Sequence, residues 1–247
     1  MHFNANTGLI NMERHFIDEP LYINTASIIL FISLCFYTYA SAQEVTTHKA
    51  YETENYKSRI AQFQAEGLAQ NQLVFLGNSL TQGGKWDTLF PKQHPVNRGI
   101  SGDNTEGVLA RLNEITKSKP AKVFLLIGIN DISQNYNNDY LCSNFEKIVQ
   151  QLKKESPETI IYIQSILPVN NDFGRYKKLI NKEKQIVQLN KRLKYLCKSE
   201  KIHYINLYPL FLQEKRILNR EYTTDGLHLN EAGYQIWANA IRNLIEE

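Results

Sequence analysis

The chain has 247 residues, of which 43% are hydrophobic and 21% are charged, as is typical of a globular α/β protein. A domain of this size can bury enough apolar surface to fold without disulfides or a structural metal. The formal net charge of +3 is too small to indicate a nucleic-acid or membrane-surface partner.

The N-terminal segment contains an uncharged apolar run. Residues 26–40 read ASIILFISLCFYTYA, and the small residues Ser41 and Ala42 follow before Gln43. An apolar run ending in A-x-A is typical of a secretory signal peptide, and a membrane span needs about 20 apolar residues. We therefore predict that residues 1–42 are a cleaved signal peptide of an exported protein, periplasmic or secreted, with no membrane association after cleavage. An uncleaved N-terminal membrane anchor is the alternative.

The rest of the chain alternates between strand and helix patterns. Residues 43–69 form a polar lead-in, in which an amphipathic helix is expected over 56–69. Short apolar runs predict strands at 73–76, 122–127, 159–165 and 202–207, and a second short strand is expected to end near 96–98. Amphipathic helices are predicted at 106–116, 139–155, 177–199 and 231–245. Apolar strands alternating with helices indicate a parallel sheet covered on both faces. The sequence therefore predicts a three-layer α/β/α sandwich with about five strands over residues 70–247.

In open parallel sheets, functional sites form beyond the carboxyl ends of the strands. The first strand ends in Gly77-Asn78-Ser79. A serine on a strand-to-helix turn exposes its hydroxyl, and its backbone N–H lies at a helix N-terminus. Ser79 is therefore a candidate nucleophile, although Gly-x-Ser turns are common and the motif alone is weak.

Two further segments, which follow the second and third predicted strands, contain candidate oxyanion donors. Gly99 and Gly102 in the sequence RGISGD let the backbone approach a ligand closely, although a tight turn explains glycine equally well. Asn130 in the sequence GIND offers a neutral NH₂ donor of the kind that stabilises an oxyanion, although a turn or cap role is also common for asparagine.

An acid–imidazole pair precedes the last predicted helix. Asp225 and His228 are three positions apart in the sequence DGLHLN. Asp225 could hold the Nδ1–H of His228 and leave Nε2 free to accept a proton from Ser79. Asn230 is a plausible N-cap of the helix that follows.

Taken together, the segments GNSLTQGG, NRGISGD, GIND and DGLHLN resemble the four sequence blocks of the SGNH, or GDSL-like, hydrolases. The resemblance covers about residues 70–245 and is greatest to the platelet-activating-factor acetylhydrolase-like and carbohydrate O-acetylesterase-like branch. It implies a flavodoxin-like sheet and ester hydrolysis without metal or cofactor. It also implies Ser79 as nucleophile, His228 as base and Asp225 as its orienter, with Ser79, Gly102 and Asn130 forming the oxyanion hole.

One position departs from the family pattern. Asn78 stands where the family name has Asp, beside the nucleophile but with no part in proton transfer. Asparagine can keep the local hydrogen bonds with one fewer charge, so we expect activity to be retained.

The predicted activity is that of a serine esterase on short-chain, acetyl-like esters of small molecules or saccharides. The loop after the fourth strand should border the pocket, with Asn170, Asn171 and Phe173 as candidate substrate contacts. The alternatives are a lysophospholipase or thioesterase for longer acyl chains, and a non-catalytic carbohydrate-binding module on the same fold. No HExxH or CxxC motif is present, so no metal is predicted.

Overall fold

The computed structural model describes residues 49–213 and 216–246. The predicted signal peptide at residues 1–42 lies outside the described residues. Within the described ranges, no helix combines the length and the apolar character needed to cross a membrane.

The sheet has five strands, which are β1 (Leu73–Gly77), β2 (Val96–Gly99), β3 (Lys122–Leu126), β4 (Ile160–Gln164) and β5 (His203–Ile205). Every pairing is parallel and the strand order is β2-β1-β3-β4-β5. This is the flavodoxin-like order, with its switch point between β1 and β3. The last residues of β1, β2 and β3 are in register, so the segments that follow these strands start at the same edge of the sheet.

A helix lies in each of the segments where the sequence predicts one, and three short helices were not predicted. The α-helices are α2 (Glu54–Glu66), α3 (Ser79–Gln82), α4 (Trp86–Leu89), α5 (Thr105–Ser118), α6 (Ile129–Ser133), α7 (Asn138–Glu155), α8 (Glu183–Glu200) and α9 (Glu231–Glu246). Short 3-10 helices are η1 (Ala50–Glu52), η2 (Asn171–Phe173), η3 (Lys177–Leu179), η4 (Tyr208–Phe211) and η6 (Arg220–Tyr222). The helix predicted over 177–199 is divided into η3 and α8, because Asn181 adopts a left-handed φ of 61° between them.

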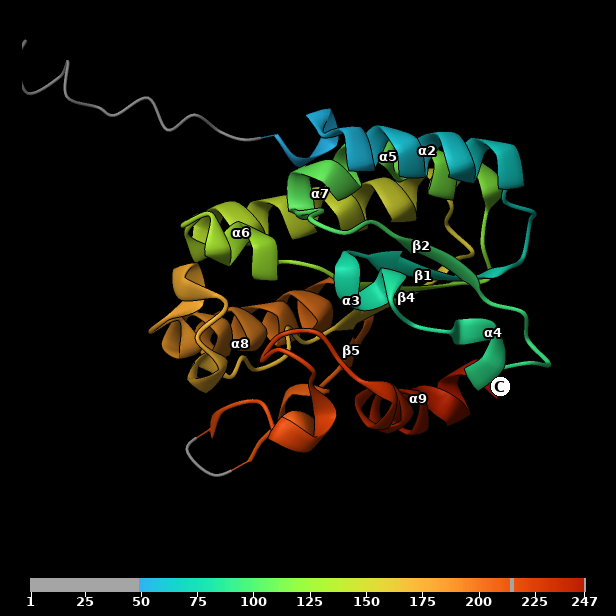
Figure 1. The fold of residues 1–247 in the computed structure, drawn as a ribbon. Coiled ribbons are helices and arrows are strands. Elements are labelled where there is room, and N and C mark those ends of the chain that lie inside the picture. Colours follow the sequence, from blue (N-terminus) through green and yellow to red (C-terminus); the bar gives the residue numbers. More distant parts are fainter. Residues whose placement is uncertain (1–48, 214–215, 247) are drawn as a thin grey trace, which may run out of the picture. The chain divides into compact units, whose positions relative to one another are not determined.

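Two apolar cores lie on opposite faces of the sheet. On one face, Val74 and Leu125 pack with the buried sides of α5, α7 and α8. On the other face, Phe75 stacks on Trp86 of α4 with 3.8 Å between ring centroids, and Trp237 of α9 completes the cluster. Figure 1 shows α5 and α7 on one side of the strands and α9 on the other. The predicted three-layer sandwich is confirmed.

Helix α2 packs on the segment that follows β2. Thr53 caps its N-terminus by accepting the N–H of Tyr56 at 3.2 Å. Tyr56 and Phe63 form a small apolar cluster with Ile100, which is fully buried. The hydroxyl of Tyr56 also donates to the carbonyl of Gly107 in α5 at 2.7 Å. The helix is therefore joined to the loop that carries the second predicted site segment.

Candidate active site

The predicted nucleophile begins a helix at the end of β1. Ser79 is the first residue of α3 and is half-buried. Asn78 caps this helix, since its Oδ1 accepts the N–H of Leu80 at 3.0 Å. The Asn78 side chain is fully buried. A neutral amide therefore keeps the capping hydrogen bond without burying a charge at this position.

The predicted base lies beside the serine. His228 Nε2 is 2.9 Å from Ser79 Oγ, although the two residues are 149 positions apart in the chain. His228 Nδ1 is 2.8 Å from Asp225 Oδ2. These distances join the three side chains in the order that general-base activation of a serine requires.

Local hydrogen bonds hold Asp225 in its orientation. Its Oδ1 accepts the N–H groups of Leu227 at 3.0 Å and of His228 at 2.8 Å. Thr223 Oγ1 accepts the N–H of Gly226 at 2.9 Å and donates to the His228 carbonyl at 2.7 Å. Burial opposes ionisation of Asp225, but the hydrogen bonds from Tyr176, His228 and the backbone outweigh it and hold its pKa well below the usual value. Asp225 is therefore a carboxylate at neutral pH.

Tyr176 makes a contact that sequence reasoning missed. Its hydroxyl donates to Asp225 Oδ2 at 2.6 Å and lies 2.9 Å from His228 Nδ1. Burial and the neighbouring carboxylate raise the pKa of Tyr176 to about 12, so it stays a donor. The sequence places Tyr176 in the loop expected to border the pocket, but no local pattern indicates its contact with Asp225, because the two residues are 49 positions apart.

The predicted oxyanion donors lie on neighbouring loops. Asn130 is the second residue of α6, and its Nδ2 donates to the carbonyl of Asp103 at 2.7 Å. Gly102 precedes Asp103 and is exposed, with a φ of 83°. Within the described part of the chain, the N–H groups of Ser79 and Gly102 donate to no protein acceptor. Both are therefore available to a ligand.

A buried ion pair lies beneath these loops. Arg111 of α5 contacts Asp103 Oδ2 through Nη2 at 2.8 Å and through Nε at 3.0 Å. The same Nη2 donates to the Gly77 carbonyl at 3.1 Å, next to the nucleophile turn. Burial raises the pKa of Asp103 to about 6 against the attraction of Arg111, so the pair is charged at neutral pH. This pair joins the segments after β1 and β2.

A second buried carboxyl joins the segments after β2 and β3. Asp131 is fully buried and accepts the N–H of Thr105 at 3.1 Å as well as its hydroxyl. Asn144 of α7 donates to the same hydroxyl at 2.9 Å. Burial raises the pKa of Asp131 to about 7. The contact holds the start of α6, and hence Asn130, against the start of α5.

Asn170, a predicted substrate contact, has an internal role. Its side chain is 1% exposed, which leaves almost no surface for a ligand. Its Nδ2 donates to the Leu218 carbonyl at 2.9 Å and its Oδ1 accepts the Asp172 N–H at 3.1 Å. Its backbone N–H also donates to the Gly226 carbonyl at 2.8 Å. Asn170 therefore positions the loop against the turn that carries Asp225.

The other two predicted contacts differ from each other. Asn171 Nδ2 bonds inside the loop, to the Leu179 carbonyl at 3.3 Å and to Glu183 Oε1 at 3.1 Å. Phe173 is half-buried, and the guanidinium of Arg220 lies 4.7 Å from its ring centroid. Asn170 and Asn171 use their side-chain amides in internal hydrogen bonds, whereas the side chain of Phe173 is partly exposed and could contact a substrate.

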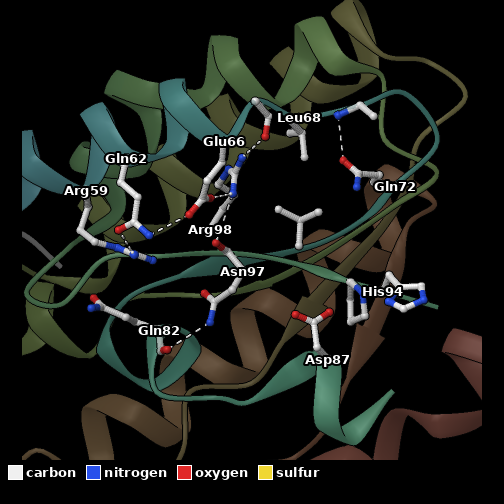
Figure 2. Close-up of a pocket in the computed structure, with 14 residues that line it drawn as sticks. Arg59, Gln62, Glu66, Leu68, Gln72, Gln82, Asp87, His94, Asn97 and Arg98 are labelled. Carbon is white, nitrogen blue, oxygen red and sulfur yellow. Dashed lines mark hydrogen bonds and ion pairs between the residues drawn. The ribbon is translucent and has the colours of Figure 1, made fainter. Parts of the chain in front are cut away.

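A polar cavity of about 870 Å³ lies beside the edge strand β2 (Figure 2). Neither Ser79 nor His228 lines it. Its polar groups bond mainly to each other: Arg59 Nη1 donates to Gln62 at 2.6 Å, Gln62 donates to Glu66 at 2.7 Å, and Glu66 pairs with Arg98 at 3.0 Å. This cavity is therefore separate from the serine and the histidine that are predicted to carry the chemistry.

The described residues contain no group of three or more His, Cys, Asp or Glu side chains that could hold a metal ion. Cys142 and Cys197 are buried free thiols. Burial raises the pKa of Cys197 to about 12, which makes it inert as a nucleophile.

Fold and site together define a flavodoxin-like α/β protein with a serine–histidine–aspartate arrangement at the carboxyl edge of its sheet. The profile of the GDSL-like Lipase/Acylhydrolase family matches residues 75–236, and the chain belongs to this family of acylhydrolases.

Known proteins agree with this assignment. Platelet-activating factor acetylhydrolase IB subunit alpha1 of Rattus norvegicus is 28% identical over 181 residues, covering 70% of this chain and 75% of that protein. A GDSL-like lipase of Bacteroides thetaiotaomicron is 30% identical, with a TM-score of 0.68 and coverage of 78% of this chain and 97% of that one. An acetyl-xylooligosaccharide esterase of Geobacillus shares the fold at 18% identity, with a TM-score of 0.58 and coverage of 73% and 96%.

Proposed function

We propose that this acylhydrolase is a serine esterase that cleaves short-chain, acetyl-like carboxylic esters through a covalent acyl-enzyme. Ser79 is the nucleophile, His228 the general base and Asp225 the residue that orients His228. The single observation that carries the proposal is the continuous hydrogen-bond chain, with 2.9 Å from Ser79 Oγ to His228 Nε2 and 2.8 Å from His228 Nδ1 to Asp225 Oδ2.

The reaction proceeds in two acyl-transfer steps. His228 Nε2 accepts the Ser79 proton while Oγ bonds to the ester carbonyl carbon, and the imidazolium then gives this proton to the departing alcohol. A water molecule next loses a proton to His228 and attacks the acyl-serine, which releases the acid and restores the Ser79 hydroxyl. Asp225 remains ionised throughout and stabilises the imidazolium.

The negative oxygen that forms in each step needs preorganised donors. We assign this role to the N–H groups of Ser79 and Gly102 and to the side-chain amide of Asn130. An amide NH₂ has two hydrogens. The bond from Asn130 Nδ2 to the Asp103 carbonyl uses one of them and fixes the orientation of the amide, which leaves the second for the oxyanion.

One observation favours a short acyl group, since the rat relative is by name an acetylhydrolase. For a saccharide ester, we propose that the half-buried Phe173 contacts the alcohol portion.

The test is hydrolysis of p-nitrophenyl acetate, butyrate and octanoate by the wild type and Ser79→Ala, with the surface variant Ser58→Ala as control. We expect acetate to be preferred, Ser79→Ala to lose at least about 10⁴-fold in kcat, and Ser58→Ala to match the wild type. Substantial turnover by Ser79→Ala would refute the nucleophile. Preference for octanoate would favour the lysophospholipase or thioesterase alternative, and a folded wild type that no fluorophosphonate labels would favour the non-catalytic module.

We also propose that the protein is exported and that residues 1–42 are removed, leaving the hydrolase domain of residues 70–247 with its N-terminal lead-in. The apolar run at 26–40 and the A-x-A site before Gln43 support this proposal. Intact-mass measurement of the protein recovered outside the cytoplasm should give a chain that starts at Gln43. A mass that includes residues 26–40 would instead support the membrane anchor.

A further inference from the structure

The loop that presents Gly102 is a β-turn over residues 100–103. The Asp103 N–H donates to the Ile100 carbonyl at 3.1 Å, and Gly102 has a φ of 83°, whereas Ser101 is not among the residues with positive φ. A positive φ at the third position alone defines a type II turn. The central peptide joins Ser101 to Gly102, and its carbonyl and N–H point in opposite directions because the peptide is planar and trans.

This turn has a competing form. In a type I turn the central peptide is rotated by about half a turn and the third residue has a φ near −90°. Glycine adopts both values readily, so Gly102 by itself does not decide between the two forms. In the rotated form the Gly102 N–H would point in the opposite direction, and the oxyanion hole proposed above would lose one donor. A contact to the Ser101 carbonyl can therefore decide the direction of the Gly102 N–H.

The structure has such a contact. Asn55 of α2 donates through Nδ2 to the Ser101 carbonyl at 2.8 Å. We propose that Asn55 is a positioning residue that holds the Ser101 carbonyl and thereby orients the Gly102 N–H toward the oxyanion. This inference rests on the proposed esterase function. It assigns a catalytic contribution to a helix that precedes residues 75–236, the part of the chain that matches the family.

Other contacts hold the rest of the loop, so that Asn55 acts on one peptide. Gln82 Oε1 accepts the Ser101 N–H at 2.6 Å, and Arg59 Nη2 donates to the Gly99 carbonyl at 3.2 Å. Ile100 is buried against α2. These contacts fix both ends of the turn but leave the central carbonyl to Asn55.

Asn55 is exposed, and among the described residues its side chain makes no hydrogen bond other than the one to the Ser101 carbonyl. Asn55→Ala should therefore unfold at the same temperature as the wild type. We expect kcat for p-nitrophenyl acetate to fall about three- to tenfold, the size of one hydrogen bond, with KM unchanged within about twofold. The control is Gln64→Ala, which removes an exposed amide from the same helix and should leave kcat unchanged.

Asn55→Asp sharpens the test. At pH 8 its carboxylate cannot donate and repels the Ser101 carbonyl. The loss of kcat should therefore exceed that of Asn55→Ala. A loss in Asn55→Asp no larger than in Gln64→Ala would overturn the proposal.

A double-mutant cycle separates positioning from a general effect of α2. In Gly102→Ala the added methyl disfavours the positive φ, so the type II turn is already lost. Adding Asn55→Ala should then cause no further loss in kcat, whereas in an Asn130→Ala background it should cause its full loss. An equal loss in all backgrounds, or an effect confined to KM, contradicts the proposal.

The two proposals fail in different ways. If the wild type is inactive or Ser79→Ala keeps its activity, the esterase assignment fails. If activity depends on Ser79 but Asn55→Ala behaves like Gln64→Ala, only the role of Asn55 fails.

Discussion

The two sides of the active site are built differently. On the base side, Asp225 and His228 lie in an irregular turn whose hydrogen bonds come from the turn itself, from Asn170 and Tyr176 of the loop after β4, and from Ser79. On the oxyanion side, the loops that carry Gly102 and Asn130 start at the sheet and are joined from below by the buried Arg111–Asp103 ion pair and by the buried carboxyl of Asp131.

This difference predicts which substitutions should lower activity without lowering the stability of the fold. The His228 and Asp225 side chains are 36% and 10% exposed, but a neutral substitution such as Asp225→Asn leaves no buried charge without a partner. Asp103 and Arg111 have side chains that are 0% and 3% exposed, so a change there leaves a buried charge without its partner. Base-side variants should fold and lose activity, whereas variants beneath the oxyanion loops should lose stability first.

The largest expected effect is on the base side. Asp225→Asn keeps the shape of the side chain but removes the charge that orients His228 and stabilises the imidazolium. We expect kcat to fall by about 10⁴-fold. Steady-state kinetics and thermal unfolding measure the two quantities, with the exposed Asp172→Asn as control. A loss below about tenfold would show that Asp225 does not act on His228 as proposed.

Beneath the oxyanion loops, Arg111→Met should act mainly on stability. It leaves the Asp103 carboxylate buried without a cation and should cost about 3–5 kcal/mol in the free energy of unfolding. Urea unfolding measures this change. The matched control is Arg192→Met, which breaks an exposed pair with Asp139 and should cost less than about 1 kcal/mol. Equal losses in the two variants would contradict the contrast between the two sides.

Asn130→Ala should give the next largest effect, because it removes a donor and not a buried charge. We expect kcat to fall by about 10²–10³-fold, with KM and the unfolding temperature close to the wild type. A loss below about threefold in the folded variant would remove Asn130 from the oxyanion hole.

The pH dependence of stability should show the burial of Asp131. Its pKa is raised from 3.8 to about 7, so the folded chain binds a proton that the unfolded chain has released. This contribution is complete below pH 3.8 and is lost as the pH rises through 7. Between pH 5 and pH 8, urea unfolding should therefore show a smaller loss of stability in Asp131→Asn than in the wild type. Parallel losses would contradict this prediction.

The smallest effect is expected for Tyr176→Phe. The variant removes one donor to Asp225 but leaves His228 and the backbone N–H groups in place. One lost hydrogen bond corresponds to a few-fold change in kcat. Acid unfolding should shift to higher pH, because the stability contributed by the depressed pKa of Asp225 is present above its unfolded value and is lost as the pH falls through its folded value. An unchanged acid transition would show that Tyr176 does not stabilise the carboxylate.

Local patterns in the sequence were sufficient for much of the fold. Four of the strands could be predicted because their apolar runs end at glycines or polar residues, and α2, α5, α7 and α9 because their apolar residues recur at helical spacing. The Asp225–His228 contact could also be predicted, since the two residues are three positions apart. The division between η3 and α8 could not, because the left-handed turn at Asn181 leaves the helical spacing of the apolar residues intact.

The sequence by itself determined the order of the elements, the residues at the strand ends and the short-range contacts, because periodicity and turn chemistry act over a few residues. Only the tertiary structure brought Ser79 to His228 across 149 positions, Tyr176 to Asp225, and Asn55 to Ser101. Asn170 shows the same division: its loop was predicted at the site, but packing turned its side chain inward. Contacts between distant segments depend on how helices and loops pack on the sheet, and local spacing carries no information about that packing.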